Sequence, residues 1–183
     1  MQRMQRMLVV LLALSAIGLG AARAQQSAAP PLPATHVASE DIKVALNRAP
    51  QKAVNPQPNL RVVNAGGFNV AIGAIHRPQT PPGIAAVHFK VTEVYHVLDG
   101  AGTFVTGGTL VNPKTRAADS VEVTQEDGPG ASGSSIEGGA SRRIKAGDVV
   151  VVPAGTPHWF SNIEGAISYV VVRIDPSQIL TLK

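Results

Sequence analysis

The chain has 183 residues, of which 44% are hydrophobic and 15% charged, with no cysteine and a formal net charge of +4. This length suits one domain, and the apolar share is high enough for a packed core, which excludes a generally disordered chain. The absence of cysteine excludes a disulfide framework, a thiolate metal site and a cysteine nucleophile. A positive net charge can indicate a polyanionic partner, so the position of the basic residues matters.

The first 24 residues have the features of a secretion signal. Two arginines precede an apolar run from 7 to 19, and Ala22 and Ala24 supply the small side chains that a signal peptidase recognises. The run is shorter than the about 20 residues that span a bilayer, which favours a cleavable signal over an anchor. Residues 1–24 contain three arginines and no acid, so their removal leaves 13 basic residues against 12 acidic ones. We therefore expect a periplasmic or secreted protein with no membrane anchor after cleavage and no nucleic-acid partner.

The segment 25–57 is predicted to contain a tether followed by one short helix. Its first part is rich in Ala, Pro, Gln and Ser, a composition that favours disorder. Ser39 can cap a helix whose first turn is acidic, apolar residues recur at helical spacing, and Pro50 ends the pattern. A helix is therefore expected at 39–49.

From residue 58 onward, short β-branched and aromatic runs alternate with Gly and Pro, as is typical of an all-β domain. Strands are expected at 60–64, 68–76, 84–90, 93–98, 102–106, 109–111, 149–153, 157–162 and 166–174. Many short strands without intervening amphipathic helices favour a sandwich or a barrel.

Two glycine-rich places interrupt the strand pattern. The segment 112–146 is rich in Gly and Ser and is expected to be a long loop, either a solvated spacer or a lid or binding loop. The sequence Gly100-Ala101-Gly102 is expected to form a hairpin turn between two strands, since no helix follows it to make a dinucleotide site.

A motif near the C-terminal end carries a family resemblance. Gly147, Pro153, Gly155, His158 and Asn162 are separated by five, one, two and three residues. This spacing resembles the second conserved motif of the cupin superfamily, in which all five of these positions are fixed. The resemblance implies a single cupin-type β-jelly-roll barrel over residues 58–175, followed by a C-terminal tail at 176–183. The short helix expected at 39–49 would precede this barrel.

The first cupin motif is matched in its second half. His88, Glu93 and Gly100 stand at the spacing of that motif, whereas Ala86 occupies the position of its first histidine. Members of the superfamily commonly hold a divalent metal inside the barrel with three histidines and one glutamate.

Carried over residue by residue, the resemblance offers His88, Glu93 and His158 as metal ligands. The fourth ligand is then either water or His76, at the end of an expected strand. His96 lies three residues from Glu93, so alternation along a strand turns it to the opposite face, away from the metal.

A ligand set of two imidazoles and one carboxylate suits Fe(II), Mn(II), Ni(II) or Zn(II) and leaves coordination positions open for substrate or O₂. The leading interpretation is a small-molecule metalloenzyme of the Fe(II) dioxygenase type. Tyr95 shares a face with Glu93 and is the candidate catalytic residue, as a proton donor.

Two other functions stay open. A non-catalytic ligand-binding module would keep the barrel without metal, which Ala86 favours. A metal-dependent isomerase or epimerase would need a base such as His76 or Tyr95. In each case the expected partner is a small molecule, and pairing through sheets, which is common among cupins, implies a homodimer.

Overall fold

The computed structural model describes residues 31–49, 57–79 and 84–183. The chain divides into a unit Met1–Pro31 and a unit Leu32–Lys183, and the description below concerns the second. The expected signal at 1–24 lies outside the described residues, as does part of the expected tether. Within the described ranges, no helix is both long enough and apolar enough to cross a membrane.

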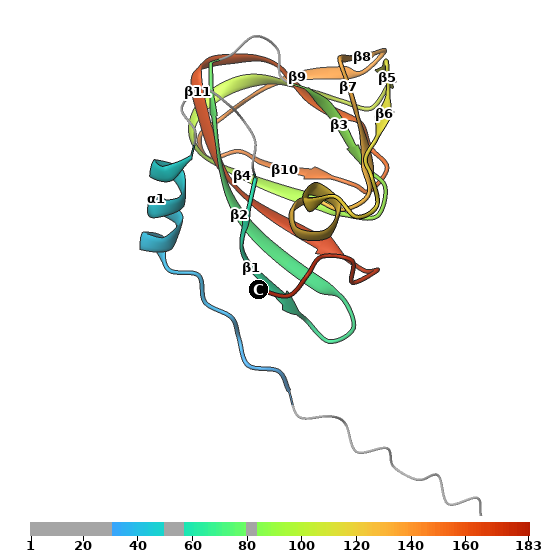
Figure 1. The fold of residues 1–183 in the computed structure, drawn as a ribbon. Coiled ribbons are helices and arrows are strands. Elements are labelled where there is room, and N and C mark those ends of the chain that lie inside the picture. Colours follow the sequence, from blue (N-terminus) through green and yellow to red (C-terminus); the bar gives the residue numbers. More distant parts are fainter. Residues whose placement is uncertain (1–30, 50–56, 80–83) are drawn as a thin grey trace, which may run out of the picture. The chain divides into compact units, whose positions relative to one another are not determined.

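The described residues form an antiparallel β-structure with one short α-helix, α1, and one short π-helix, η1 (Figure 1). In chain order, the elements are α1 (Ser39–Arg48), β1 (Asn59–Asn64), β2 (Asn69–Pro78), β3 (Ala85–His88), β4 (Thr92–Thr106), β5 (Thr109–Val111), β6 (Lys114–Thr115), η1 (Glu122–Glu126), β7 (Gly130–Gly133), β8 (Ser135–Glu137), β9 (Ala140–Lys145), β10 (Val149–Val152) and β11 (His158–Asp175). The expected helix is confirmed, although it begins at Ser39 with Ala38 as its N-cap.

Two long strands, β4 and β11, hold the barrel together (Figure 1). The second half of β11, from Ile167 onward, lies between β2 and β4, while its first half pairs with β3 and the far half of β4. The sheet therefore curls around a core of side chains from β2, β4, β9, β10 and β11. This arrangement confirms the all-β jelly-roll expectation.

The hairpin expected at Gly100 is wrong, because β4 runs through it as one bent strand. Gly100 has φ of +77°, and a Cβ at this position would lie 1.9 Å from the carbonyl oxygen of Ala166. The β4–β11 register shifts between Ile163 and Ile167, opposite this bend. A glycine is needed here so that two backbones can approach closely while both strands turn the corner of the barrel.

Substitution of Gly100 tests this corner. Gly100→Ala is expected to lower the free energy of unfolding by about 2 kcal/mol, since it adds a backbone clash to the cost of a positive φ. Gly107→Ala is the matched control, because Gly107 has φ of +76° but nothing within 4 Å of the added Cβ. The free energy of unfolding of Gly107→Ala should fall by about 1 kcal/mol. Equal losses in urea unfolding of the two variants would contradict the close approach at Gly100.

The expectation of a long loop at 112–146 is also wrong. The segment contains η1 and four strands, of which β7 pairs with β3 and β9 pairs with β4. These strands were missed because they are short and polar: in β9 only Ile144 is buried. Their backbone hydrogen bonds are made with distant strands, which composition does not show.

The C-terminal tail expected at 176–183 packs onto the fold. Leu180 is buried in a small cluster with Val62 and Ala71, and the backbones of Val62 and Lys183 exchange two hydrogen bonds of 3.1 and 2.9 Å. The tail therefore closes one side of the barrel beside β1.

Candidate metal centre

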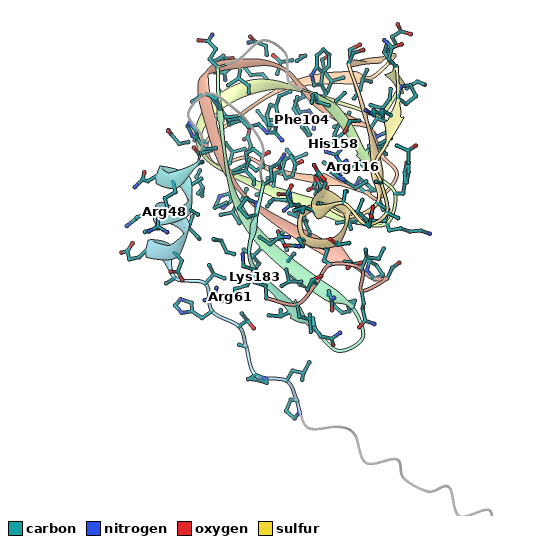
Figure 2. The ribbon with its side chains drawn as sticks, in the orientation of Figure 1. Arg48, Arg61, Phe104, Arg116, His158 and Lys183 are labelled. Carbon is teal, nitrogen blue, oxygen red and sulfur yellow. The ribbon has the colours of Figure 1, made fainter. Side chains whose placement is uncertain are left out.

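Three side chains predicted as ligands meet inside the barrel. His88 ends β3, Glu93 lies near the start of β4, and His158 begins β11. All three are buried, and each offers a donor atom within 4.8 Å of the other two. Figure 2 shows His158 and the buried Phe104 between the strands. Strands far apart in sequence thus place two imidazoles and one carboxylate together.

The distances between the donor atoms fit a metal ion. The Nε2 atoms of His88 and His158 each lie 3.4 Å from Oε2 of Glu93. Metal bonds of about 2.0–2.2 Å place neighbouring ligand atoms about 3 to 3.5 Å apart. Because two imidazoles and a carboxylate are also a suitable donor set for divalent metals, this group can bind one.

A tight turn before β11 joins the two histidine strands. The backbone N–H of Gly155 donates to the carbonyl of His88 at 2.7 Å, and the N–H of Ala154 donates to the Thr92 hydroxyl at 3.1 Å. Gly155 has φ of +82°, which favours glycine. The Pro-Ala-Gly turn of the motif therefore fixes the end of β3 relative to the start of β11.

The imidazole of His158 is held in its neutral form. Its Nδ1 lies 3.1 Å from the carbonyl oxygen of Thr156, which can only accept, so Nδ1 carries the proton and Nε2 has the free lone pair. Burial, and then the nearby His88, lower the pKa of His158 from 6.5 to about 4. The imidazole is therefore ready to bind a metal at neutral pH.

The carboxylate of Glu93 is held in its charged form. Burial alone would raise the pKa of Glu93, but His88 and the Arg173 guanidinium lower it well below its usual range. The Nε of Arg173 donates to Oε1 at 2.9 Å, while Nη1 donates to Asn59 at 2.7 Å. Arg173 thus occupies one carboxylate oxygen and leaves the other facing the histidines.

Tyr95 donates its hydroxyl proton to Oε2 of Glu93 at 2.7 Å. Burial and the Glu93 charge raise the pKa of Tyr95 well above its usual range, so its hydroxyl stays protonated. The sequence-based expectation that Tyr95 shares the face of Glu93 is confirmed by this contact. The residue is placed as a hydrogen-bond donor beside the ligands.

His88 has two polar neighbours that the sequence analysis did not identify. Its Nδ1 lies 3.4 Å from Nη1 of Arg116 and 3.9 Å from Oδ1 of Asp127, and Arg116 and Asp127 form an ion pair. Both residues belong to the segment expected to be a loop. Arg173 was also missed, although a lone arginine among the inward positions Tyr169 and Val171 of an apolar strand was a usable signal.

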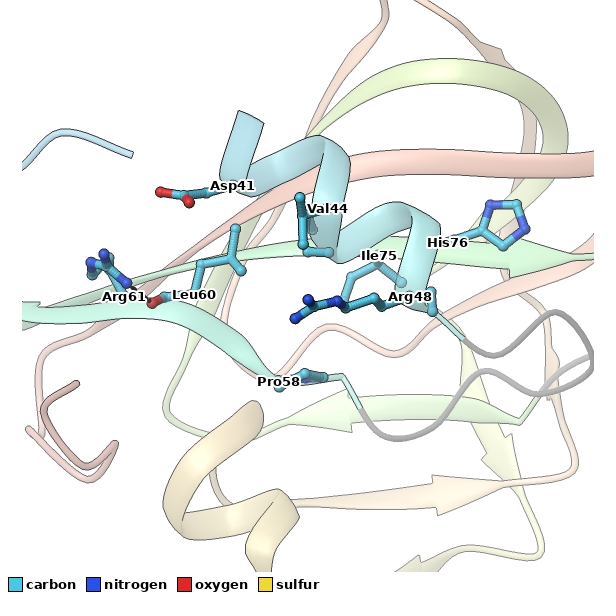
Figure 3. Close-up of a pocket in the computed structure, with 11 residues that line it drawn as sticks. Asp41, Val44, Arg48, Pro58, Leu60, Arg61, Ile75 and His76 are labelled. Carbon is cyan, nitrogen blue, oxygen red and sulfur yellow. Dashed lines mark hydrogen bonds between the residues drawn. The ribbon is translucent and has the colours of Figure 1, made fainter. Parts of the chain in front are cut away.

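The other two candidate histidines lie away from this cluster. The Nδ1 of His76 is 2.9 Å from the Ser168 hydroxyl, and the residue lines a cavity of about 430 Å³ between α1 and the β1–β2 hairpin (Figure 3). The structure does not bring His76 to the ligand group, which leaves water as the remaining alternative for the fourth position. His96 is exposed on the outer face of β4, as alternation predicts.

Ala86 lies directly opposite His158 in the pairing of β3 with β11, and it shares a strand face with His88. We expect Ala86→His to supply a fourth protein ligand and to tighten Zn²⁺ or Mn²⁺ binding about 10-fold or more in a competitive chelator titration. Ala86→Leu adds bulk without a donor and is expected not to tighten binding. A similar gain in both variants would contradict a ligand effect.

A protein-family model described as Cupin matches residues 46–182. Similar solved structures include a Bacillus halodurans protein with 13% identity and a TM-score of 0.45, which covers 82% of this chain and 89% of that one. A Klebsiella pneumoniae protein with a double-stranded β-helix domain has 14% identity and a TM-score of 0.44, covering 80% and 94%. A predicted oxalate decarboxylase of Thermotoga maritima has 18% identity and a TM-score of 0.35, covering 67% and 98%. No curated protein matches the chain.

Proposed function

Because the chain belongs to the cupin family, whose model matches residues 46–182, we propose that His88, Glu93 and His158 hold one divalent metal in a small-molecule metalloenzyme. The observation that carries the proposal is the convergence of two Nε2 atoms on one carboxylate oxygen, each at 3.4 Å. With only three protein ligands, positions stay open on the metal for substrate or O₂. We favour Fe(II) and a dioxygenase-type reaction, with Mn, Ni or Zn as other candidate metals.

The residues around the ligands prepare them for this role. Arg173 keeps Glu93 ionised, and the Thr156 carbonyl keeps the proton of His158 on Nδ1. The bound metal would supply Lewis acidity and a route for electrons to O₂. Tyr95, protonated and hydrogen-bonded to Glu93, is placed to donate a hydrogen bond or a proton to a ligand beside the carboxylate.

The isomerase alternative loses support from the geometry. It requires a base near the substrate, and the two residues considered for that role were His76 and Tyr95. His76 pairs with Ser168 outside the ligand group, and the raised pKa of Tyr95 keeps its hydroxyl protonated. The non-catalytic binding module keeps one supporting feature, the alanine at position 86.

Metal analysis tests the proposal. The mature protein, reconstituted with Fe, Mn, Ni or Zn and desalted, is expected to hold about one metal per chain by mass spectrometry of the digested sample. Glu93→Gln and His158→Ala should each lose most of it, because each removes one of three ligands. His96→Ala, an exposed histidine on the same strand as Glu93, is the matched control and should keep the metal.

The absence of stoichiometric metal in the wild-type protein would overturn the metalloenzyme and leave the binding module. If metal is present, O₂ uptake by the Fe(II)-loaded protein with phenolic or diketone compounds tests the oxygenase part separately. Retention of metal without O₂ uptake would reject the oxygenase chemistry alone.

We also propose that the protein acts in the periplasm or outside the cell, which the basic and apolar pattern of residues 1–24 supports. Mass spectrometry of the protein from fractionated cells should find Gln25 as its first residue. A cytoplasmic chain that starts at Met1 would contradict export.

A further inference from the structure

Arg77 is a cation directed into the barrel. It follows Gly73 and Ile75 on the same face of β2, whose pairing with β11 is regular at these positions. Ile75 is part of the buried core, and a Cβ at Gly73 would contact Val171 and the guanidinium of Arg173. Arg77 therefore projects into the interior that also contains the ligand group.

Aromatic side chains fix the position of its guanidinium. Nε donates to the Tyr169 hydroxyl at 2.7 Å, and Cζ lies 5.5 Å from the ring centre of Phe160 and 5.8 Å from that of Tyr169. The Tyr169 ring lies 4.6 Å from that of Tyr95, whose hydroxyl contacts Glu93. Buried aromatic rings in contact with one another therefore connect Arg77 with the candidate metal ligands.

No carboxylate within the described residues forms an ion pair with Arg77. Within the described residues, the ion pairs of the interior join Arg173 to Glu93 and Arg116 to Asp127, and none includes Arg77. The remaining ranges, 1–30, 50–56 and 80–83, contain neither Asp nor Glu. An arginine cannot give up its charge in a protein, so a half-buried guanidinium without a counter-ion is costly unless an anion joins it.

The terminal nitrogens of Arg77 are open to an incoming molecule. The residue is half-buried. Among the described residues, one side-chain polar atom is both buried from solvent and without a hydrogen-bond partner. It is Oδ1 of Asp175, and no nitrogen of Arg77 is in this state. The Nη atoms therefore remain reachable, and they present N–H donors in the planar fork that matches a carboxylate.

We propose that Arg77 binds the carboxylate of the substrate, and that the substrate is a small organic acid. As a statement about the substrate, this rests on the proposed metalloenzyme. The binding of a carboxylate by Arg77 needs no metal, so this proposal and the metalloenzyme proposal can fail separately. Tyr169 is a positioning residue here, since it holds Nε and leaves the Nη fork free.

Calorimetric titration with benzoate and its uncharged analogue benzamide tests the assignment, on metal-free and metal-loaded protein. Benzoate is expected to bind both forms at least about 10-fold more tightly than benzamide, because a charge-assisted bidentate contact is available only to the carboxylate. Arg77→Met keeps the apolar stem and should remove this preference. Arg77→Lys should keep part of it, since lysine keeps the charge but loses the fork.

Two further variants separate binding from folding. Arg143→Met removes a surface arginine that pairs with Glu164 and should bind benzoate as the wild type does. Tyr169→Phe keeps the guanidinium but frees Nε, and should weaken benzoate binding less than Arg77→Met does. Thermal unfolding of each variant shows that it is folded at the titration temperature.

Equal binding of benzoate and benzamide by the wild type, or an undiminished preference in a folded Arg77→Met, would overturn the assignment. Benzoate preference in a protein that binds no metal would keep Arg77 as an anion-binding residue and reject the metalloenzyme. Metal binding without a preference for benzoate would keep the metalloenzyme proposal and reject Arg77 as an anion-binding residue.

Discussion

Arg173→Met is expected to lower the free energy of unfolding of the metal-free protein by about 3 to 5 kcal/mol, the cost of leaving a buried charge without its partner. The side chains of Arg173 and Glu93 are 1% and 2% exposed, and Nε and Oε1 are 2.9 Å apart. Methionine fills similar space without a charge, so the loss comes from the stranded carboxylate and from the unmatched oxygen of Asn59. Urea unfolding at pH 7, with chelator present, measures it.

Two comparisons isolate the contribution of the buried Arg173–Glu93 ion pair to the free energy of unfolding. Adding Glu93→Gln to Arg173→Met removes the stranded charge and should recover much of the loss, as a double-mutant cycle would show. Arg143→Met breaks an arginine–glutamate pair that is 56% and 43% exposed, and its unfolding midpoint should hardly change. A small loss in Arg173→Met, comparable to that in Arg143→Met, would mean that Glu93 is not held as a buried anion.

The convergence of His88, Glu93 and His158 could be predicted from the sequence because the three residues stand at the spacings of the two cupin motifs. His158 belongs to a motif of fixed spacing with a tight turn, and Glu93 and Tyr95 alternate on one strand face, as their hydrogen bond confirms. His96 was assigned to the outer face by the same rule. Local spacing does not say which distant strand lies opposite, so Arg173, which pairs with Glu93 across β4 and β11, was not found.

The polar surroundings of His88 could not be predicted, because they depend on chain segments without a local signal. Arg116 and Asp127 lie between β6 and β7, two short strands of which β7 pairs with the distant β3, so composition alone favoured a loop there. The hairpin expected at Gly100 was wrong for a similar reason. Glycine often indicates a turn, but at this position it allows one strand to bend against another. Both errors concern tertiary pairing, which overrides local preference.

A second large effect is expected when the pH is lowered, because protonation of His158 should reduce the stability of the metal-free protein. Its pKa is about 4 in the folded protein and 6.5 as an ordinary histidine, since burial and His88 oppose its charge. Between these values the unfolded chain binds a proton at this residue and the folded chain does not. Stability of the metal-free protein should therefore be full above pH 6.5 and should fall as the pH is lowered to 4, by about 3 kcal/mol from this residue.

The contribution of His158 can be separated from those of the other titrating groups by difference. His158→Gln replaces it with a neutral side chain, so the wild type should lose stability relative to this variant as the pH falls from 6.5 to 4. Because the pKa of Glu93 is lowered in the folded protein, its own loss of stability begins near its ordinary pKa of 4.5 and continues below it, so it touches only the acidic end of this window. His96→Gln removes an exposed imidazole and should follow the wild-type curve. Parallel curves for the wild type and His158→Gln across this window would show that the imidazole is not buried in its neutral form, and would remove the basis for treating it as a metal ligand at neutral pH.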